Sequence, residues 1–312
     1  MINPGKAYTY KSSSGLCDIS AWGYFPADNI RIKGVVQIAH GMAEHHKRYE
    51  DFISYLNNNG YAVFINDHLG HGESVTDDSQ LGFFGTENGW QNIVDDAKSL
   101  TDIAVNEFPE LPVILFGHSM GSFVARLYSA QYGDSVDAVV YCGTAGANPA
   151  AGVGLAMVNA IIRMKGTHHR SKLIDKLAFG TYNSKIKPSR TSFDWLTKCE
   201  DIVDAYINDD YCGFLFTASG YKDLMEMIVE VNKDGWFTSV RTDLPIYLVA
   251  GAADPVGNYG KGIKEVYKNL VKTGHTDVTI KLFSDDRHEI LNEKDKSDVY
   301  RNILSWLNAI TE

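Results

Sequence analysis

The stretch FGHSMGSF, residues 116–123, places a lone serine, Ser119, between two glycines directly after the apolar run LPVIL. Glycine is used where a side chain does not fit or where the backbone takes an unusual φ angle, so we expect the serine on a very tight turn. After it, Phe123, Leu127 and Ala130 follow at helical spacing. A buried strand, a G-x-S-x-G turn and a helix form the context that presents a nucleophilic serine above the edge of a sheet.

Short apolar runs rich in β-branched residues recur along the chain and alternate with helical periods. Such runs suit strands that are covered on both faces, and their alternation with helices indicates a mostly parallel sheet flanked by helices. The N-terminal 30 residues look instead like an antiparallel hairpin at the sheet edge. The expected strands are 35–39, 61–66, 112–116, 138–142 and 246–250, and the apolar helical stripes fall at 49–56, 90–104, 263–270 and 300–307.

The segment from about residue 146 to residue 237 interrupts this alternation, because it has helical and loop-like sequence without a strand-like run. We expect residues 1–145 and 238–312 to form the α/β core. Residues 146–237 are expected to form a mainly helical cap inserted between two strands of the sheet. Insertions of this kind lie at the carboxyl ends of strands and often cover a site.

Composition restricts the partners and the compartment. The net charge of −10 argues against nucleic acid as a partner and against charge-based anchoring on anionic lipid. The N-terminus has no apolar signal region, and the longest apolar stretch, about a dozen residues, is too short to span a bilayer. Four cysteines without C-x-x-C spacing indicate reduced thiols, so we expect a cytoplasmic protein without an integral membrane segment.

A serine nucleophile needs a base and an acid that orients the base, in the chain order serine, acid, histidine for this fold. Of the ten histidines, only His275 and His288 follow the cap and the next strand. His275 precedes the last strand, VTIKLF, and so lies at the wrong end of the sheet, whereas His288 follows it. Asp254 follows the strand IYLVA and is the expected acid. The alternatives, Asp285 and Asp286, are too close to His288 in sequence to reach its ring easily.

The oxyanion of the reaction needs two N–H donors. One is expected from Met120, the residue after the nucleophile, and the other from the loop that follows an early strand. That loop is AHGMAEH, residues 39–45, in which we expect Met42 to be the donor. Glu44 and His45 are expected to brace the start of the next helix rather than to react.

These motifs resemble the monoacylglycerol lipase and bacterial lysophospholipase family of α/β-hydrolases. The resemblance is carried by HGMAEHHKRYEDF, NDHLGHGES, GHSMGS, GAADPV and DRHEILNE, and it covers about residues 30–145 and 240–310. It implies that the nucleophile, acid, base and two oxyanion donors are Ser119, Asp254, His288, Met42 and Met120. One departure is Ala43, which stands where some relatives with H-G-x-G-E-H have glycine. In the cap the resemblance is loose.

Asp67, His68 and His71 lie close together in DHLGHG, but no HExxH sequence or spaced Cys/His set accompanies them. We therefore expect a structural loop beside the site and no metal. The sequence has no dinucleotide fingerprint and no Walker A motif, so no cofactor is expected.

The sequence thus predicts a serine hydrolase that cleaves carboxylic esters of fatty acids, of the monoacylglycerol or lysophospholipid type, through an acyl-enzyme. We expect its substrate to be a small acyl ester, which the protein reaches through transient contact with lipid aggregates. The sequence does not predict the oligomeric state. The residues expected to line the acyl site, with ordinary packing of the cap as the alternative, are Leu155, Val158, Phe214 and Phe216.

An aminopeptidase or a thioesterase that uses the same triad is the alternative function, because the fold alone does not separate these activities. A noncatalytic receptor on the same scaffold would typically lack a triad member, whereas all three are present here. Several acidic residues of the cap either bind a substrate amine or form a solvated face: Glu200, Asp201, Asp204, Asp209 and Asp210.

Overall fold

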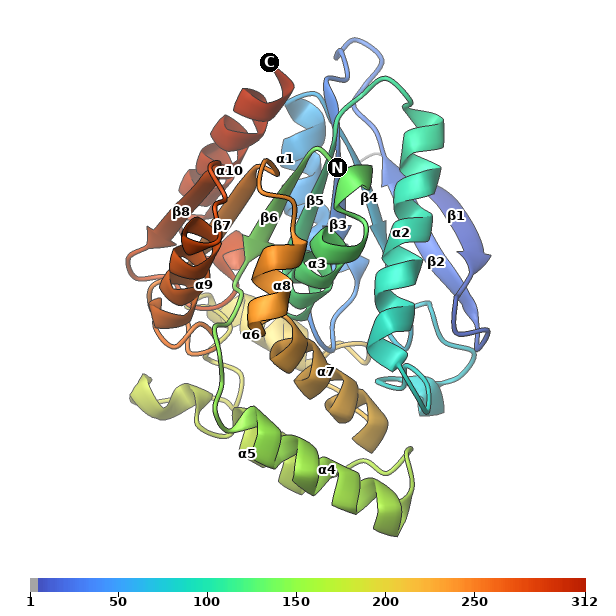
Figure 1. Ribbon diagram of the computed structural model, residues 1–312, viewed down its shortest axis with the longest axis vertical. Coiled ribbons are helices and arrows are strands. Elements are labelled where there is room, and N and C mark those ends of the chain that lie inside the picture. Colours follow the sequence, from blue (N-terminus) through green and yellow to red (C-terminus); the bar gives the residue numbers. More distant parts are fainter. Residues whose placement is uncertain (1–4) are drawn as a thin grey trace.

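A mostly parallel eight-stranded sheet runs through the computed structural model, which describes residues 5–312 (Figure 1). The strand order is β1-β2-β4-β3-β5-β6-β7-β8. The pairs β1–β2 and β2–β4 are antiparallel and all other neighbours are parallel, which confirms the predicted sheet and its N-terminal edge hairpin. The strands are β1 (Lys6–Lys11), β2 (Asp18–Tyr24), β3 (Gly34–Ala39), β4 (Tyr61–Asn66), β5 (Val113–His118), β6 (Ala138–Cys142), β7 (Ile246–Gly251) and β8 (Val278–Phe283).

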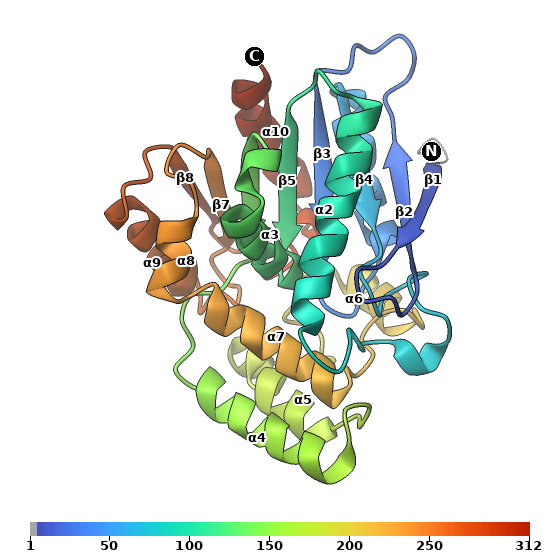
Figure 2. The same cartoon turned by 45° about the vertical axis from the view of Figure 1, so that its right-hand side comes forward.

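The two faces of the sheet carry separate apolar cores. Strands β3 to β7 are buried along their whole length, because helices cover both faces. In β5, Val113 and Leu115 pack into one core, while Ile114 and Phe116 pack into the other. The helices that cover the first core are α2 (Gly89–Glu107), α3 (Met120–Gln131) and α9 (Lys261–Lys272), and those that cover the second are α1 (Glu50–Asn58) and α10 (Lys296–Thr311) (Figures 1 and 2).

The chain between β6 and β7 consists of helices and the loops that join them. Helices α4 and α5 lie together at one end of the molecule in both views, beyond α7 (Figures 1 and 2). Helix α7 packs against α4 on one side and against α2 and α3 on the other, so it joins this region to the core. The division of the chain into core and cap at residues 145 and 238 remains a prediction, and the word cap is used below for the chain between β6 and β7. The helices are α4 (Ala151–Lys165), α5 (Lys172–Phe179), α6 (Glu200–Ile207), α7 (Ala218–Glu230) and α8 (Asp234–Ser239).

The turn between β5 and α3 is as tight as its glycines indicate. Ser119 has a φ of 55° and a ψ of −119°, a strained conformation for a residue with a side chain. A Cβ atom on Gly117 would lie 2.2 Å from the carbonyl oxygen of Gly121, and one on Gly121 would lie 2.0 Å from that of Ala39. The two glycines therefore allow β3, β5 and α3 to approach more closely than any other residue permits.

Two further findings concern membrane-spanning helices and the cysteines. Among residues 5–312, none of the helices combines the length and the hydropathy that a membrane span requires. All four cysteines carry free thiols: Cys17, Cys142, Cys199 and Cys212.

The close approach at Gly121 predicts that adding a single methyl group to this residue strongly lowers the stability of the protein. Gly121→Ala should lower the free energy of unfolding by about 3 kcal/mol or more, because the new Cβ meets backbone that cannot rotate away. Gly152→Ala is the control: it lies in α4, and its Cβ would have no neighbouring heavy atom within 4 Å. This control should be neutral or stabilising by up to about 1 kcal/mol. Denaturant unfolding measures both, and equal stability of the two variants would contradict the account.

Candidate active site

Three side chains from separate loops meet at the carboxyl edge of the sheet. Ser119 follows β5, Asp254 follows β7 and His288 follows β8. The Nε2 atom of His288 lies 2.7 Å from Ser119 Oγ, and its Nδ1 atom lies 3.0 Å from Asp254 Oδ2. Asp254 and His288 are buried, and Asp254 Oδ1 also accepts a hydrogen bond from the backbone N–H of Val256 at 2.8 Å. This geometry lets the imidazole accept the serine proton while the carboxylate fixes its tautomer.

The alternative acid and base residues lie elsewhere. His275 lies before β8, where its ring is 3.0 Å from the carbonyl oxygen of Leu270. Asp286 forms an ion pair with Lys198 at 3.0 Å, and Asp285 is exposed. The structure therefore brings Ser119 together with the histidine and the aspartate that chain order selects.

The loop after β3 passes directly over Ser119. A Cβ atom on Gly41 would lie only 3.2 Å from the Cβ of Ser119. Met42 and Met120 both border the same cavity as Ser119. Met120 is the first residue of α3, so its N–H precedes the hydrogen-bond ladder of the helix. Within residues 5–312, the N–H of Met42 donates no backbone hydrogen bond, which leaves this donor available to a ligand.

Ala43 occupies a backbone conformation that favours glycine. Its φ is 50°, in the left-handed region, which costs a residue with a side chain about 1 kcal/mol. Its carbonyl oxygen accepts hydrogen bonds from the N–H of Gly213 at 3.0 Å and from the hydroxyl of Tyr206 at 3.1 Å. These two bonds attach the loop to the cap segment and hold Ala43 in the strained conformation.

A buried ionic network supports this loop from behind. Glu44 accepts hydrogen bonds from the N–H of Gly41 at 2.5 Å and from the hydroxyl of Tyr49 at 2.7 Å. Arg48 donates to Glu44 at 2.6 Å and makes two parallel hydrogen bonds of 2.7 Å to Glu289. Glu44 thus braces the loop. Through Arg48 and Tyr49 it also contacts the residues that lead into α1, which is the position where the sequence predicts that it acts. The sequence reasoning missed Arg48 and Glu289, although the i, i+4 spacing of Glu44 and Arg48 after the His-Gly turn is a signal for an ion pair.

The charged groups in this network shift one another's pKa values. Burial acts to raise the pKa of Glu44 and of Glu289, but the Arg48 guanidinium outweighs it and holds both pKa values below their ordinary range. Burial acts to lower the pKa of His118, but the hydrogen bond and charge of Glu44 outweigh it and raise that pKa. Because His118 Nε2 lies 3.3 Å from the carbonyl oxygen of His288, the network connects the Met42 loop with the His288 loop.

A cavity of about 710 Å³ opens at Ser119 and extends beneath the cap. Its volume is within the range of small-molecule sites. Much of its wall is apolar and comes mainly from the chain between β6 and β7. Besides Met42 and Met120, the larger apolar lining residues include Phe123, Leu177, Phe179, Phe193, Trp195, Leu196, Phe214, Leu215, Leu224, Ile228 and Val256.

Of the four residues expected to bind the acyl chain, only Phe214 borders the cavity. Val158 and Phe216 are fully buried in the core, where the ring of Phe216 packs edge-on against Phe84 with centroids 5.1 Å apart. Leu155 is half-buried on α4, outside the lining. Ordinary packing therefore accounts for these three, because apolar character does not reveal which side of a cap segment faces the cavity.

The acidic cap residues also lie away from the cavity. Asp209 pairs with His45 at 2.8 Å and Asp204 pairs with Arg190 at 2.6 Å. Glu200, Asp201 and Asp210 are likewise absent from the lining. In the DHLGHG loop, the Asp67 carboxylate accepts hydrogen bonds from the N–H groups of His46 and Glu73, so it fixes the loop as expected.

Comparisons with known proteins show the family to which the chain belongs. Residues 30–295 match the Hydrolase_4 family, described as serine aminopeptidase, S33. A monoacylglycerol lipase from Mycolicibacterium smegmatis is 27% identical, with 88% of each chain covered. The phospholipase YtpA from Bacillus subtilis is 25% identical, and the match covers 86% of this chain and 92% of that protein. A thermostable carboxyl esterase from Bacillus coagulans is 32% identical, with a TM-score of 0.92 over 99% of this chain and 100% of that one. The resemblance predicted from the motifs is confirmed.

The ionic network predicts that Arg48→Ala destabilises the protein by about 3–5 kcal/mol at neutral pH, because two buried carboxylates lose their cation. The control is Lys47→Ala, whose partner Glu73 is exposed and 3.5 Å away; it should cost less than about 1 kcal/mol. Equal stability of the two variants at pH 7 would show that the network contributes little.

The same network predicts a pH dependence. Because the pKa values of Glu44 and Glu289 are lowered on folding, their contribution is present above the ordinary glutamate value of 4.5 and is lost as the pH falls through the lowered values. The stability difference between wild type and Arg48→Ala should therefore shrink as the pH is lowered below 4.5. Denaturant unfolding at a series of pH values measures it, and a difference independent of pH would contradict this assignment.

Proposed function

The chain is an ester hydrolase that belongs to the Hydrolase_4 family of α/β-hydrolases, and we propose that it cleaves fatty-acyl esters of the monoacylglycerol or lysophospholipid type. One observation carries the proposal: Ser119 Oγ, 2.7 Å from His288 Nε2, borders a cavity of about 710 Å³ with a partly apolar wall. The names of the lipase, phospholipase and esterase relatives support the same substrate class.

The proposed mechanism uses the triad twice. Ser119 Oγ attacks the ester carbonyl while His288 Nε2 takes its proton, and Asp254 holds the imidazole in the required tautomer. The N–H groups of Met42 and Met120 stabilise the oxyanion of the tetrahedral intermediate. His288 then protonates the departing alcohol, which leaves an acyl group on Ser119. Water, activated by His288, attacks that acyl group and releases the fatty acid.

The carboxylates at the cavity wall bear on the alternative of an aminopeptidase, an activity that the description of the family includes. Glu44 and Glu289 are paired with Arg48, and Asp175 accepts a hydrogen bond from the hydroxyl of Tyr221 at 2.9 Å. At these three carboxylates a substrate ammonium group would have to compete with the existing partners. The fourth carboxylate, Glu265, is exposed, so water screens its attraction for an ammonium group. An acyl chain, in contrast, gains about 0.8 kcal/mol for each CH₂ buried against the apolar wall. These contacts favour the ester over the aminoacyl amide; a thioester remains an outcome of the substrate test.

Apolar side chains on the outside of the cap support transient contact with the lipid aggregates that hold such substrates. Val153 and Met164 of α4 are each 74% exposed, and Leu173 of α5 is 58% exposed. Exposed groups of apolar residues mark interaction surfaces. The four free thiols favour a reducing compartment, so we propose a cytoplasmic location.

The triad predicts a graded loss of activity. Ser119→Ala and His288→Ala should each lower kcat by roughly 10³-fold or more, and Asp254→Asn should lower it by several orders of magnitude, with folding retained. A fluorophosphonate should label the wild type once, at Ser119. Ser192→Ala is the matched control, since Ser192 borders the same cavity away from the triad. Labelling at another serine, or full activity of Ser119→Ala, would refute the assignment.

The apolar wall predicts a dependence on acyl length. For p-nitrophenyl esters, kcat/KM should rise roughly tenfold for every two added CH₂ groups until the cavity is filled. Ile228→Trp narrows the cavity and should shorten the preferred chain without abolishing turnover of the acetate ester. Leu155→Trp, which lies outside the lining, should leave the profile unchanged. A flat profile, or faster cleavage of aminoacyl amides than of esters, would favour the peptidase instead.

A further inference from the structure

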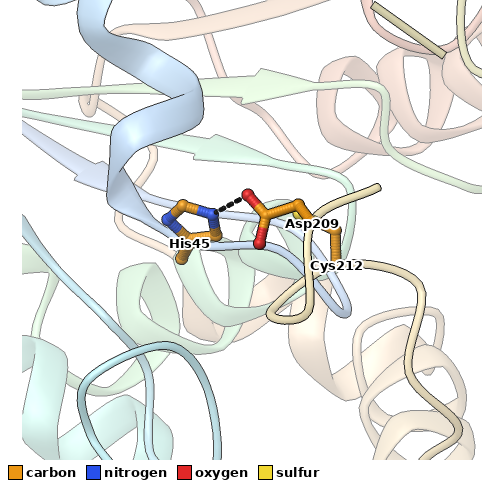
Figure 3. Close-up of side chains that lie close together, drawn as sticks. All are labelled: His45, Asp209 and Cys212. Atoms are coloured by element: carbon orange, nitrogen blue, oxygen red, sulfur yellow. Dashed lines mark hydrogen bonds and ion pairs between the residues drawn. The ribbon is translucent and has the colours of Figure 1, made fainter. Parts of the chain in front are cut away.

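A second cluster of reactive side chains lies at the junction between the cap and the Met42 loop. His45, Asp209 and Cys212 each offer one ligand atom, and these atoms lie within 4.8 Å of one another. Figure 3 shows the His45 ring facing the Asp209 carboxylate, with Cys212 on the same turn as Asp209. None of the three residues borders the Ser119 cavity, so the proposed ester hydrolysis does not use them.

The donor set is suited to a zinc ion. Imidazole nitrogen, carboxylate oxygen and thiolate sulfur bind Zn²⁺ at about 2.0–2.3 Å, which places tetrahedral ligand atoms about 3.2–3.8 Å apart. The three ligand atoms lie within 4.8 Å of one another, and His45 Nε2 lies 2.8 Å from Asp209 Oδ2, which is closer than this spacing. A small outward movement of the Asp209 carboxylate would open the centre for the ion.

The backbone fixes two of the three ligands relative to each other. The N–H of Cys212 donates to the carbonyl oxygen of Asp209 at 3.0 Å, and the N–H of Tyr211 donates to Asp209 Oδ1 at 2.9 Å. These bonds close a turn that presents both side chains toward His45. His45 is held in turn by the hydrogen bond from the N–H of Arg48 to its carbonyl oxygen at 3.2 Å.

The cluster is accessible from solvent on one side. The Asp209 side chain is 34% exposed, whereas that of His45 is 9% exposed. A cation can therefore enter past Asp209, and water can take the fourth position, as in open zinc sites. Cysteine binds zinc as the thiolate, so binding releases the proton of the Cys212 thiol.

We propose that His45, Asp209 and Cys212 form a zinc site that clamps the cap onto the loop carrying Met42. His45 lies three residues after Met42, and the turn of Asp209 and Cys212 lies between α6 and α7. Next to the cluster, the N–H of Gly213 and the hydroxyl of Tyr206 already bind the carbonyl oxygen of Ala43. A bound ion adds a third link, so it restricts the movement of the loop and slows turnover. The effect on turnover, though not the binding itself, rests on the proposed function.

Cobalt substitution tests the site without any enzymatic readout. Chelator-treated protein titrated with Co²⁺ should develop thiolate-to-cobalt charge-transfer absorption in the near ultraviolet, and one equivalent of Zn²⁺ should remove it. Cys212→Ser should abolish this absorption, and His45→Ala and Asp209→Asn should weaken metal binding by roughly tenfold or more. Cys199→Ser is the matched control, because Cys199 is also a cap cysteine with a free thiol, and it should bind as the wild type does.

The rate of ester hydrolysis tests the clamp. Zn²⁺ should slow the wild type by roughly fivefold or more, reversibly on chelation, and should not slow Cys212→Ser. Absence of the cobalt band from the wild type, or its persistence in Cys212→Ser, would overturn the site. Zinc binding without a change in rate, or equal inhibition of Cys212→Ser, would overturn the clamp. A chain that hydrolyses no ester but shows the cobalt band would refute the proposed function and leave the metal site established.

Discussion

The close approach of β3, β5 and α3 around Ser119 is the constraint on which the rest of the site depends. Without Cβ atoms on Gly117 and Gly121, the carbonyl oxygen of Ala39 comes close to the first turn of α3. This contact puts the loop after β3 directly beside the serine. The left-handed backbone of Ser119 costs about 1–3 kcal/mol, which the burial of five strands on both faces of the sheet offsets.

The ionic network extends this constraint from the serine turn to the other two parts of the site. Arg48 holds Glu44, which braces the loop of Met42, and Glu289, which follows His288 directly. The N–H of Glu289 donates to the carbonyl oxygen of Leu196 at 2.7 Å, and Leu196 lines the cavity from the cap. The proposed oxyanion loop, the histidine loop and the cavity wall are thus held by one set of buried contacts, so a change at Arg48 affects all three.

The sequence predicts the sheet and the meeting of Ser119, Asp254 and His288 for one physical reason. Parallel strands place their carboxyl ends at the same edge, so residues that follow different strands converge whatever their separation along the chain. No comparable rule predicts which residues of the cap line the cavity. Val158 and Phe216 are as apolar as Phe214, yet only Phe214 borders it. The pairing of Arg48 with Glu289, 241 residues away, likewise follows from the tertiary fold and leaves no local pattern.

The central claim is that Ser119 carries the acyl group during turnover. The most direct measurement is the mass of the proteolytic peptide containing Ser119 after reaction with a long-chain p-nitrophenyl carbamate, whose carbamoyl group leaves serine slowly. The account predicts that this peptide gains the mass of the carbamoyl group at Ser119, with stoichiometric release of p-nitrophenol and loss of ester hydrolysis. A carbamoyl group on another residue, with the Ser119 peptide unmodified while activity is lost, would contradict it.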